Sequence, residues 1–375
     1  MDIHLFSPKF RIEECLDQIR ECLEKGWTGL GYKTVEIEKQ WRDYVGLPHA
    51  HFLNSNTSGL NLAVEILRDR LNWAKGDEVI STPLTFVSTN HAILLAGLTP
   101  VFADVDEYLC LDPESVAARI TPRTRAVMFV GMGGNSGRYA EIVALCRKHG
   151  LALILDAAHM AGTRVSGAHV GAEADVVIYS FQAVKNLPTA DSGMICFQRS
   201  EDDERVRKLT WLGINKDTYV RTVNPGAYKW RYDVEEVGYK YHGNSIMASL
   251  ALVGLKYLDD DNAYRRRLAA RYSANLAGKP GIAVVPTAPG CESSNHLCQI
   301  RVANRDEVMT LLNENRVYPG VHYQDNISYR MYAHAAGTCP HAAAASNEII
   351  SLPMHLRMGD EEVDRICDLL VRFAK

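Results

Sequence analysis

Short apolar runs alternate with stretches of helical periodicity over most of the first 240 residues. Runs rich in Val, Ile and Leu occur at EVIST, PVFADV, RAVMFV, LALILDAA, ADVVIYSF and GMICFQ. Helical spacing separates several of them, as in LNLAVEILRDRL, NHAILLAG and YAEIVALCRKHG. Continuous apolar runs between helices are typical of parallel strands that are covered on both faces. The pattern predicts an α/β layered domain from about residue 40 to about residue 240.

A leader helix precedes this domain, and a smaller α+β region follows it. Helical spacing runs from Ile12 to Lys25 and ends at the glycines of GWTGLGY. A long helix with a charged face, ALVGLKYLDDDNAYRRRLAARY, is followed by a strand and a helix in CQIRVANRDEVMTLLNENRV and by the terminal amphipathic helix EEVDRICDLLVRF. We predict a large domain at residues 1–250 and a smaller one at 251–375.

Composition and charge exclude several classes of protein. The chain has 375 residues, 47% of them hydrophobic, which is enough for a large core. Its 41 basic residues are scattered among 45 acidic ones and form no Lys/Arg block that would attract nucleic acid or an anionic membrane. No apolar run approaches the roughly 20 residues that span a bilayer, and the first residues lack the features of a signal peptide. We expect a cytoplasmic protein whose nine cysteines form neither disulfides nor a zinc site.

Polar or aromatic residues follow two early strands, and sites in open parallel sheets lie at such strand ends. In FLNSNTSGL, Thr57 and Ser58 open a helix. Hydroxyls and free amides at a helix N-terminus suit a phosphate, although plain helix capping by either residue is the more common reason for this pattern. In STPLTFVSTNHA, Phe86 stands at the start of the next helix, and alone it is typical of a core residue.

A carboxylate and a lysine follow two later strands. Asp156 ends the run LALILDAAH, with His159 three residues later, and a buried carboxylate requires a cation or several donors, unless it caps a helix. Ser180 ends ADVVIYS, and Lys185 follows in a turn, where a lone lysine is usually a solvated charge. Taken together, a lysine, a carboxylate, an aromatic ring and hydroxyls at the ends of one sheet are what pyridoxal 5′-phosphate (PLP) requires.

The chain resembles the DegT/DnrJ/EryC1/StrS sugar aminotransferase family, which belongs to the fold type I PLP enzymes. The matching motifs, in order, are WTGLGYK, NSNTSGLNLA, TPLTFVSTNHAILLAGLTPVFADVD, LDAAHMAG, SFQAVKN, GYKYHGNSIMA, GVHY and SLPMH. The resemblance implies an α/β fold with a mostly parallel seven-stranded sheet between helices, plus a smaller C-terminal α+β domain. It also implies a homodimer with shared active sites.

The resemblance assigns roles to residues by position. It implies that Lys185 binds PLP as an imine and that Asp156 contacts the pyridine nitrogen. Phe86 matches the aromatic residue that stacks on the cofactor, and His159 matches a position near the cofactor ring. The positions around the phosphate match Thr57, Ser58 and Ser180.

Several positions depart from the family pattern. Asn56 replaces a common glycine, and asparagine tolerates a positive φ better than most residues. Residues 188–193 and the segment VGMGGNSGRY also differ from the usual sequence. Lys240 stands where many members carry an asparagine that reaches the cofactor phosphate of the partner subunit. We expect Lys240 or Asn244 to take that role.

The resemblance implies ping-pong transamination from L-glutamate to a keto sugar that is linked to a nucleotide. The form of the motif SFQAVKN favours amination at C4 of the sugar over C3. Because residue 185 is lysine, the chain does not match the branch that carries histidine there and performs dehydration. Candidate substrate contacts, in segments that match substrate-side loops, are Lys33, Arg231, His322 and Tyr323.

Other functions remain open from the sequence. A PLP-dependent lyase or dehydratase would share the cofactor residues, an aminotransferase could act on a cyclitol ketone, and a regulatory protein could keep the fold without turnover. A dinucleotide-dependent sugar enzyme is not favoured, because no GxGxxG follows the first strand and GMGGN, at residues 131–135, comes after a later one.

Overall fold

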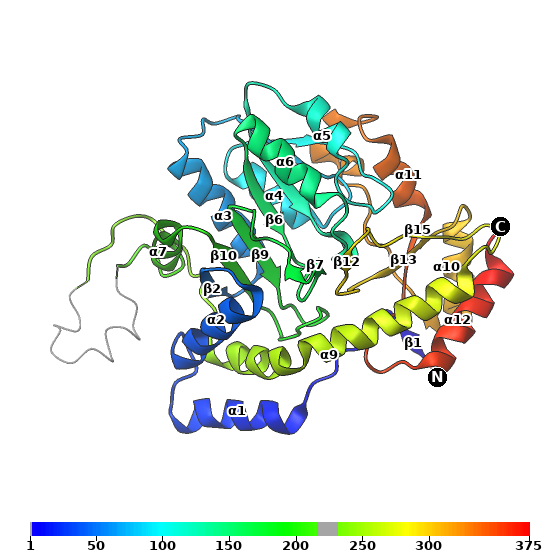
Figure 1. The fold of residues 1–375 in the computed structure, drawn as a ribbon. Helices are drawn as coiled ribbons and strands as arrows, with labels where there is room; N and C mark the ends of the chain where they lie inside the picture. The colour runs from blue at the N-terminus through cyan, green and yellow to red at the C-terminus, as the bar shows by residue number, and fades with distance from the viewer. Residues whose placement is uncertain (1, 216–231) are drawn as a thin grey trace.

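A seven-stranded sheet forms the centre of the protein (Figure 1). The computed structural model describes residues 2–215 and 232–375. Every strand pairing in this sheet is parallel except the two that β10 makes with its neighbours. In spatial order the strands are β2 (His49–Leu53), β10 (Gly193–Phe197), β9 (Val176–Ser180), β6 (Ala152–Asp156), β5 (Thr124–Val130), β3 (Glu78–Ser81) and β4 (Thr99–Phe102). The predicted, mostly parallel sheet of seven strands is therefore confirmed.

Helices cover both faces of the sheet, and alternate residues of a strand lie in two separate cores. Ile154 lies in one core, whereas its neighbours Leu153 and Leu155 lie in the other. The first core contains α3 (Asn56–Arg70), α4 (Val87–Leu95) and α7 (Ser200–Leu209). The second contains α2 (Tyr32–Val45), α5 (Pro113–Arg119), α6 (Tyr139–His149) and the start of α9 (Ser245–Leu276). Burial on both faces explains the unbroken apolar runs of the sequence.

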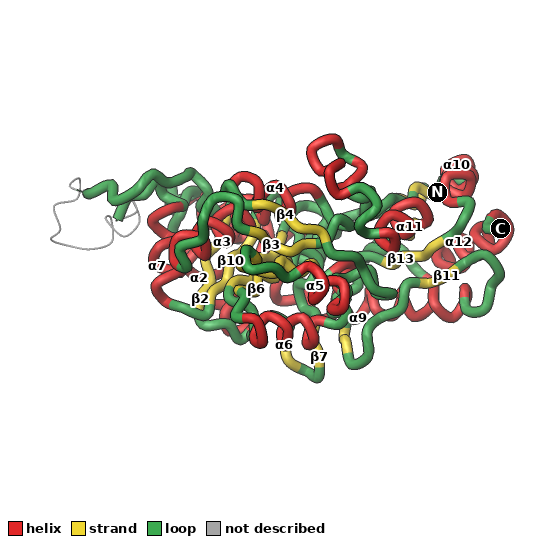
Figure 2. Tube along the Cα trace, turned by 90° about the horizontal axis from the view of Figure 1, so that it is seen from above, coloured by secondary structure: helices red, strands yellow, loops and turns green. Residues whose placement is uncertain are grey.

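A smaller unit lies at the end of the molecule opposite α7, and both chain termini lie there (Figures 1 and 2). Its antiparallel sheet has the order β11-β13-β15 and shares a third core with the C-terminal part of α9. The first strand, β1 (Ile3–His4), pairs in parallel with β14 of this unit. The elements are β11 (Ala283–Val284), β13 (Cys298–Arg301), α10 (Arg305–Glu314), β14 (Val317–Tyr318), α11 (Pro340–Glu348), β15 (Ile349–Leu352) and α12 (Asp360–Phe373).

The helix α9 joins the two units. It has 32 residues, so it is about 48 Å long. Its first part packs on α1 (Ile12–Glu24), the predicted leader helix, and on α2, whereas its last part packs on α12. Arg11, just before α1, forms an ion pair of 2.6 Å with Asp261 in the middle of α9. The domain boundary predicted at residue 250 stays a prediction, and it falls inside this helix.

The remaining features are a further small sheet, the state of the cysteines and the hydropathy of the helices. A small peripheral sheet consists of β12 (Cys291–Glu292), β7 (Arg164–Val165) and β8 (Ala168–His169). All nine cysteines are unpaired, and eight of them are buried. Over residues 2–215 and 232–375, none of the helices combines the length and the hydropathy that crossing a membrane requires.

Candidate active site

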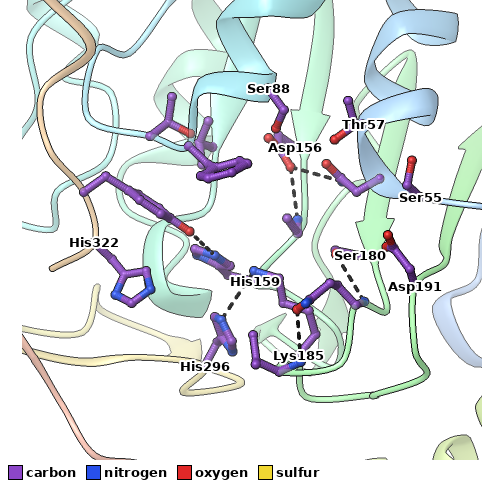
Figure 3. Close-up of a pocket in the computed structure, with 18 of the residues that line it drawn as sticks. Ser55, Thr57, Ser88, Asp156, His159, Ser180, Lys185, Asp191, His296 and His322 are labelled. Atoms are coloured by element: carbon purple, nitrogen blue, oxygen red, sulfur yellow. Dashed lines mark hydrogen bonds between the residues drawn. The ribbon is translucent and has the colours of Figure 1, made fainter. Parts of the chain in front are cut away.

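A cavity of about 510 Å³ opens at the carboxyl ends of the central strands (Figure 3). This is the edge at which open parallel sheets bind ligands. The cavity brings together eight of the residues predicted from the sequence, which are Thr57, Phe86, Asp156, His159, Ser180, Lys185, His322 and Tyr323.

Asp156 ends β6 and is buried at the bottom of this cavity. Its carboxylate accepts hydrogen bonds from Thr89 Oγ1 at 2.9 Å, from the Ala158 amide at 3.2 Å and from Asn56 Nδ2 at 3.4 Å. Burial raises the pKa of Asp156, and these donors oppose that shift. No ion pair to this carboxylate occurs within the described parts of the chain, so the carboxylate can face a cationic ring nitrogen.

Asn56 and Thr89 were not predicted as partners of Asp156. Asn56 lies in the first turn of α3 and does not have a positive φ, so the expected reason for this asparagine is wrong. Its side chain instead contacts Asp156 and the Ile178 carbonyl oxygen, both at 3.4 Å. Thr89 lies in the first turn of α4, three residues after Phe86. That position was the only feature of the sequence that could have indicated a role for Thr89 in the site.

Lys185 lies in a closed loop after β9. The Phe181 amide donates to the Ser192 carbonyl oxygen at 2.9 Å, and the Lys185 amide donates to the Gln182 carbonyl oxygen at 2.8 Å. These bonds direct the lysine side chain into the cavity (Figure 3). Burial lowers the pKa of Lys185 to about 8, while the charge of Asp156 opposes that shift. The amine is therefore available as a nucleophile or base near neutral pH, unlike a solvated lysine.

One end of the cavity is the N-terminus of α3. Ser55 is the N-cap, and its Oγ accepts a hydrogen bond of 3.1 Å from the Ser58 amide. Ser58 is buried, and its hydroxyl donates to Asn54 Oδ1 at 2.8 Å. It was predicted to lie near the phosphate, but it does not line the cavity. Thr57 and Ser180 do line it, and an anion near them would face the positive end of a 15-residue helix.

Aromatic rings form another wall. Phe86 is the N-cap residue of α4 and is 57% exposed, so it is not the core residue that its position alone suggested. Its ring centroid lies 6.0 Å from that of Tyr323. Tyr323 and His159 stack with an interplanar angle of 18°. These rings offer flat apolar contact to a planar ligand.

The hydrogen bonds of His159 fix its tautomer. Its Nδ1 accepts from the Gly133 amide at 3.2 Å, so Nε2 carries the proton and donates to Tyr323 Oη at 3.1 Å. Burial lowers the pKa of His159 well below its usual value, which keeps the ring neutral. The Tyr323 hydroxyl therefore has its own proton left to donate into the cavity.

This arrangement explains the segment GMGGN. Gly133 has a φ of 63° and Gly134 a φ of 95°, values that favour glycine. A Cβ on Gly134 would lie 2.2 Å from Ser294 Oγ. The two glycines thus form the turn that presents the Gly133 amide to His159, and they do not form a nucleotide loop.

Two further cavity residues were missed by the sequence analysis. His296 lies two residues before the start of β13, and its Nε2 lies 3.5 Å from Lys185 Nζ. Phe6 follows β1 and stacks on the His296 ring at a centroid distance of 5.3 Å. Neither residue follows a strand of the central sheet, so the strand-end pattern gave no signal for them.

Besides Ser58, the predicted residues Lys33, Lys240 and Asn244 do not line the cavity of this chain. Lys33 is buried elsewhere, and its Nζ lies 2.6 Å from Gln18 Oε1 and 2.8 Å from Glu21 Oε2, which contradicts a direct substrate contact in its own subunit. Lys240 is exposed, with Nζ 3.2 Å from the centroid of the Trp211 ring. Asn244 caps α9 by accepting from the Met247 amide at 2.9 Å. Arg231 lies outside the described residues.

The residues that are present fit PLP. Neither the buried Asp156 carboxylate nor the Lys185 amine forms an ion pair within residues 2–215 and 232–375, and Phe86 offers a ring at the mouth of the cavity. Thr57 and Ser180 lie with the helix N-terminus at the end that suits a phosphate. These are the binding groups that the cofactor requires.

Comparisons with known proteins agree with this fit. The sequence profile of the DegT/DnrJ/EryC1/StrS aminotransferase family matches residues 10–371. The spore coat polysaccharide biosynthesis protein SpsC of Bacillus subtilis (strain 168) is 34% identical over 380 residues, covering 97% of this chain and 95% of SpsC. The aminotransferase TlmJ from Streptoalloteichus hindustanus is similar in structure, with a TM-score of 0.91 and 31% identity over 99% of this chain and 98% of TlmJ.

A second similar structure was solved with a form of the cofactor. The putative sugar aminotransferase Spr1654 from Streptococcus pneumoniae, in its pyridoxamine phosphate (PMP) form, has a TM-score of 0.90 and 27% identity, covering 98% of each chain. The same protein is also similar in its PLP form, with a TM-score of 0.90.

Proposed function

The chain belongs to the DegT/DnrJ/EryC1/StrS aminotransferase family, whose members are PLP-dependent sugar aminotransferases, and we propose that it moves an amino group from L-glutamate to a keto group of a nucleotide-linked deoxy sugar. The observation that supports transamination is the placement of Lys185 and Asp156 in one cavity at the carboxyl edge of the sheet. The form of the lysine motif favours C4 of the sugar over C3 as the carbon that receives the amine.

Asp156 and the aromatic wall would hold the cofactor ring. When bound, PLP supplies an electron sink next to the carbon that carries the amino group. The Asp156 carboxylate would accept a hydrogen bond from the protonated ring nitrogen, and its three donors lower its pKa against the effect of burial. Phe86 would cover a face of the ring, and Thr57 and Ser180 would bind the phosphate.

Lys185 has two tasks in this proposal. It would attach the cofactor covalently, and once displaced by the donor amino acid its Nζ would take a proton from the donor Cα and deliver it to the cofactor carbon on the other side of the transferred nitrogen. A general base works best when its pKa lies near the working pH, and burial brings the pKa of Lys185 to about 8. The same residue then serves both halves of a ping-pong reaction.

The sugar and its diphosphate would occupy the open side of the cavity. His322 and Tyr323 line that cavity and would contact the sugar. Lys185 is the only lysine or arginine among the described residues of the lining, so a diphosphate would need cations from elsewhere. We propose that a second copy of the chain supplies cations to this cavity. We also propose that the exposed Lys240 of one protomer reaches the cofactor phosphate of the other. Asn244 caps a helix with its side-chain oxygen and has no charge, so it is the weaker candidate.

The first experiment tests the cofactor and the donor. Purified protein with PLP should show the visible absorption of a covalently bound cofactor, and L-glutamate added without an acceptor should convert that absorption to the pyridoxamine phosphate form. Lys185→Ala should lack the first band, and Lys185→Arg is the matched control, since it keeps a cation but forms no imine. A band that ignores glutamate would mean another donor or a lyase reaction, and no band at all would contradict the proposal.

Two further experiments test the acceptor and the shared site. The position of the new amino group, read by NMR on products from keto sugars linked to nucleotides, distinguishes C4 from C3 and from cyclitol amination. Mixing Lys185→Ala with Lys240→Ala subunits should restore part of the activity if sites are shared, because each hybrid dimer then contains one intact site. Absence of any recovery would contradict the role of Lys240. The proposal also places the reaction in the cytoplasm, which cell fractionation would test.

A further inference from the structure

His296 is a hydrogen-bond partner of Lys185. Its Nε2 lies 3.5 Å from Lys185 Nζ, which is long for a hydrogen bond but typical of catalytic contacts before ligands bind (Figure 3). The imidazole is buried and packed between Phe6, whose ring is parallel to it within 7°, and the ring of His159, with a centroid distance of 4.5 Å. The ring therefore has little freedom to turn away from the lysine.

The tautomer of His296 follows from a chain of hydrogen bonds behind it. Asn186 Nδ2 lies 2.7 Å from the Ser294 carbonyl oxygen. A carbonyl oxygen only accepts, so the Asn186 atom that faces it must be the nitrogen. The other atom of that amide is then Oδ1, which lies 3.0 Å from His296 Nδ1 and also only accepts. Nδ1 of His296 must therefore carry the ring proton.

A second amide supports the same assignment. Asn262, from the middle of α9, donates through Nδ2 to the Ala161 carbonyl oxygen at 2.8 Å. Its Oδ1 consequently faces Asn186 Nδ2 at 2.7 Å and accepts from it. Two carbonyl oxygens of the main chain thus fix both amides. The lone pair of His296 Nε2 is directed at Lys185 Nζ as a result.

Burial lowers the pKa of His296 well below its usual value, so the ring stays neutral and Nε2 remains an acceptor at neutral pH. His159 has the opposite tautomer, with the proton on Nε2. Of the two neighbouring imidazoles, only His296 can accept from the lysine.

We propose that His296 is a positioning residue for Lys185, accepting a hydrogen bond from Nζ whenever the amine is not attached to the cofactor, and that Asn186 and Asn262 fix His296 in the tautomer that can do so. This inference rests on the proposed function. One N–H of the free amine points to His296, which leaves the nitrogen lone pair for the donor carbon. After Nζ has taken the proton, the same acceptor stabilises the ammonium group.

Other titratable groups also surround Lys185, and their charges affect the pH at which its amine titrates. On the cavity side, besides His296, they are Asp156, His159, Asp191, His322 and Tyr323. On the far side, a much smaller cavity is lined by Lys185 together with Lys9, Asp261, Arg265 and His355. Burial holds the pKa of His322 at about 4, so that ring is neutral over the range in which Lys185 titrates.

The first test reads the tautomer directly. Histidine side-chain ¹⁵N spectra of the full-length apo-protein, compared with those of His296→Asn, identify the signal of His296. We expect the pattern of a neutral ring protonated at Nδ1 from pH 6 to 9. Asn186→Ala should shift that signal towards the Nε2-protonated form. An Nε2-protonated ring in the wild type, or no change in Asn186→Ala, would overturn the proposal.

The second test measures how Lys185 titrates. The rate at which apo-protein captures PLP as an imine should rise with pH as Nζ loses its proton. His296→Asn removes the acceptor, which disfavours the ammonium form, so the midpoint should fall by about one pH unit. His296→Gln places an amide oxygen near the position of Nε2 and should keep the wild-type midpoint. His322→Asn, the matched loss of another imidazole that lines the cavity, should also leave the midpoint unchanged.

The outcomes separate this inference from the proposed function. An unchanged midpoint in His296→Asn, or an equal fall in His322→Asn, would overturn the role of His296. If the wild type captures no PLP at all, the proposed function fails, while the ¹⁵N spectra still decide the tautomer. Should His296→Asn fail to fold, Asn186→Ala and His296→Gln give the same two readings, because the first changes the tautomer and the second keeps the acceptor.

Discussion

Thr89 Oγ1 donates a hydrogen bond of 2.9 Å to Asp156 Oδ2. It is the shortest of the three bonds that oppose the effect of burial on this carboxylate. Because burial raises the pKa of Asp156, each donor helps to keep the carboxylate charged.

Replacing Thr89 should therefore weaken cofactor binding. Thr89→Val keeps the shape of the side chain but removes the donor, and a hydrogen bond to a charged group is worth about 1.5–3 kcal/mol. We expect PLP to bind about tenfold more weakly, as measured by titration of apo-protein. Thr89→Ser keeps the hydroxyl and should bind PLP like the wild type. Equal affinity in Thr89→Val and wild type would show that Thr89 does not support Asp156.

Removing the charge of Lys185 should stabilise the apo-protein. The pKa is lowered from its ordinary value of 10.5 to about 8, so below pH 8 the folded state holds an ammonium group that prefers water. This cost is fully present below pH 8 and disappears as the pH rises to about 10.5, since the unfolded chain then binds no more protons than the folded one.

Lys185→Met should raise the free energy of unfolding at pH 7 by up to about 3 kcal/mol, and the gain should shrink between pH 8 and 10.5. Urea unfolding of apo-protein at several pH values measures it. Lys279→Met, at an exposed position, should change stability by less than about 0.5 kcal/mol. A destabilised Lys185→Met protein would contradict this account of the lysine.

The glycine turn before α6 should tolerate no side chain. Gly134→Ala combines a φ of 95° with a Cβ that would lie 2.2 Å from Ser294 Oγ, and we expect a loss of more than about 2 kcal/mol in thermal or urea unfolding. Gly290→Ala is the matched control, because Gly290 also has a positive φ, of 72°, but open space around it. It should lose only about 1 kcal/mol. Equal losses would mean that crowding at Gly134 does not matter.

Glu38 should make the fold sensitive to acid. Burial raises the pKa of this carboxyl group, but Arg207 and His51 outweigh burial and lower it to about 2. Its Oε1 lies 2.8 Å from His51 Nδ1, and its Oε2 lies 2.9 Å from Arg207 Nη1. The charged form therefore stabilises the folded state above the ordinary pKa of 4.5, and that stabilisation is lost as the pH falls towards 2.

Glu38→Gln should cost about 3 kcal/mol at pH 7 and should flatten the fall in stability between pH 5 and 2. Urea unfolding across that range gives the measurement. Glu24→Gln, at an exposed position at the end of α1, serves as the control and should keep the acid dependence of the wild type. A steep acid dependence that survives in Glu38→Gln would place its origin elsewhere.

The strand pattern predicted much of the site because parallel strands share an edge. Asp156 and Ser180 end adjacent strands, and Lys185 follows closely, so their meeting in one cavity follows from the order of the sheet. The fold class came from the same periodicity, which reflects burial of both faces. Thr57 lies at this edge, as predicted. Ser58 does not, because Ser55 is the N-cap residue and its Oγ binds the Ser58 amide.

The residues that were not predicted come from segments whose position relative to the cavity does not follow from the strand pattern. Phe6 and His296 reach the cavity from the other unit, whose approach depends on long-range packing. Lys33 matched a substrate-side loop, but nothing local showed that Glu21 and Gln18 would take its amine. The exposure of Phe86 likewise depends on what faces it across the cavity, and a single sequence does not contain that information.

The helix α9 is continuous, so the two units of the molecule pack on one and the same element. Asn262 lies near its midpoint and fixes Asn186, which adjoins Lys185. The same helix packs on α1 and α2 at one end and on α12 at the other. The loop that carries the lysine is therefore tied, through Asn186 and Asn262, to the one element on which both units pack.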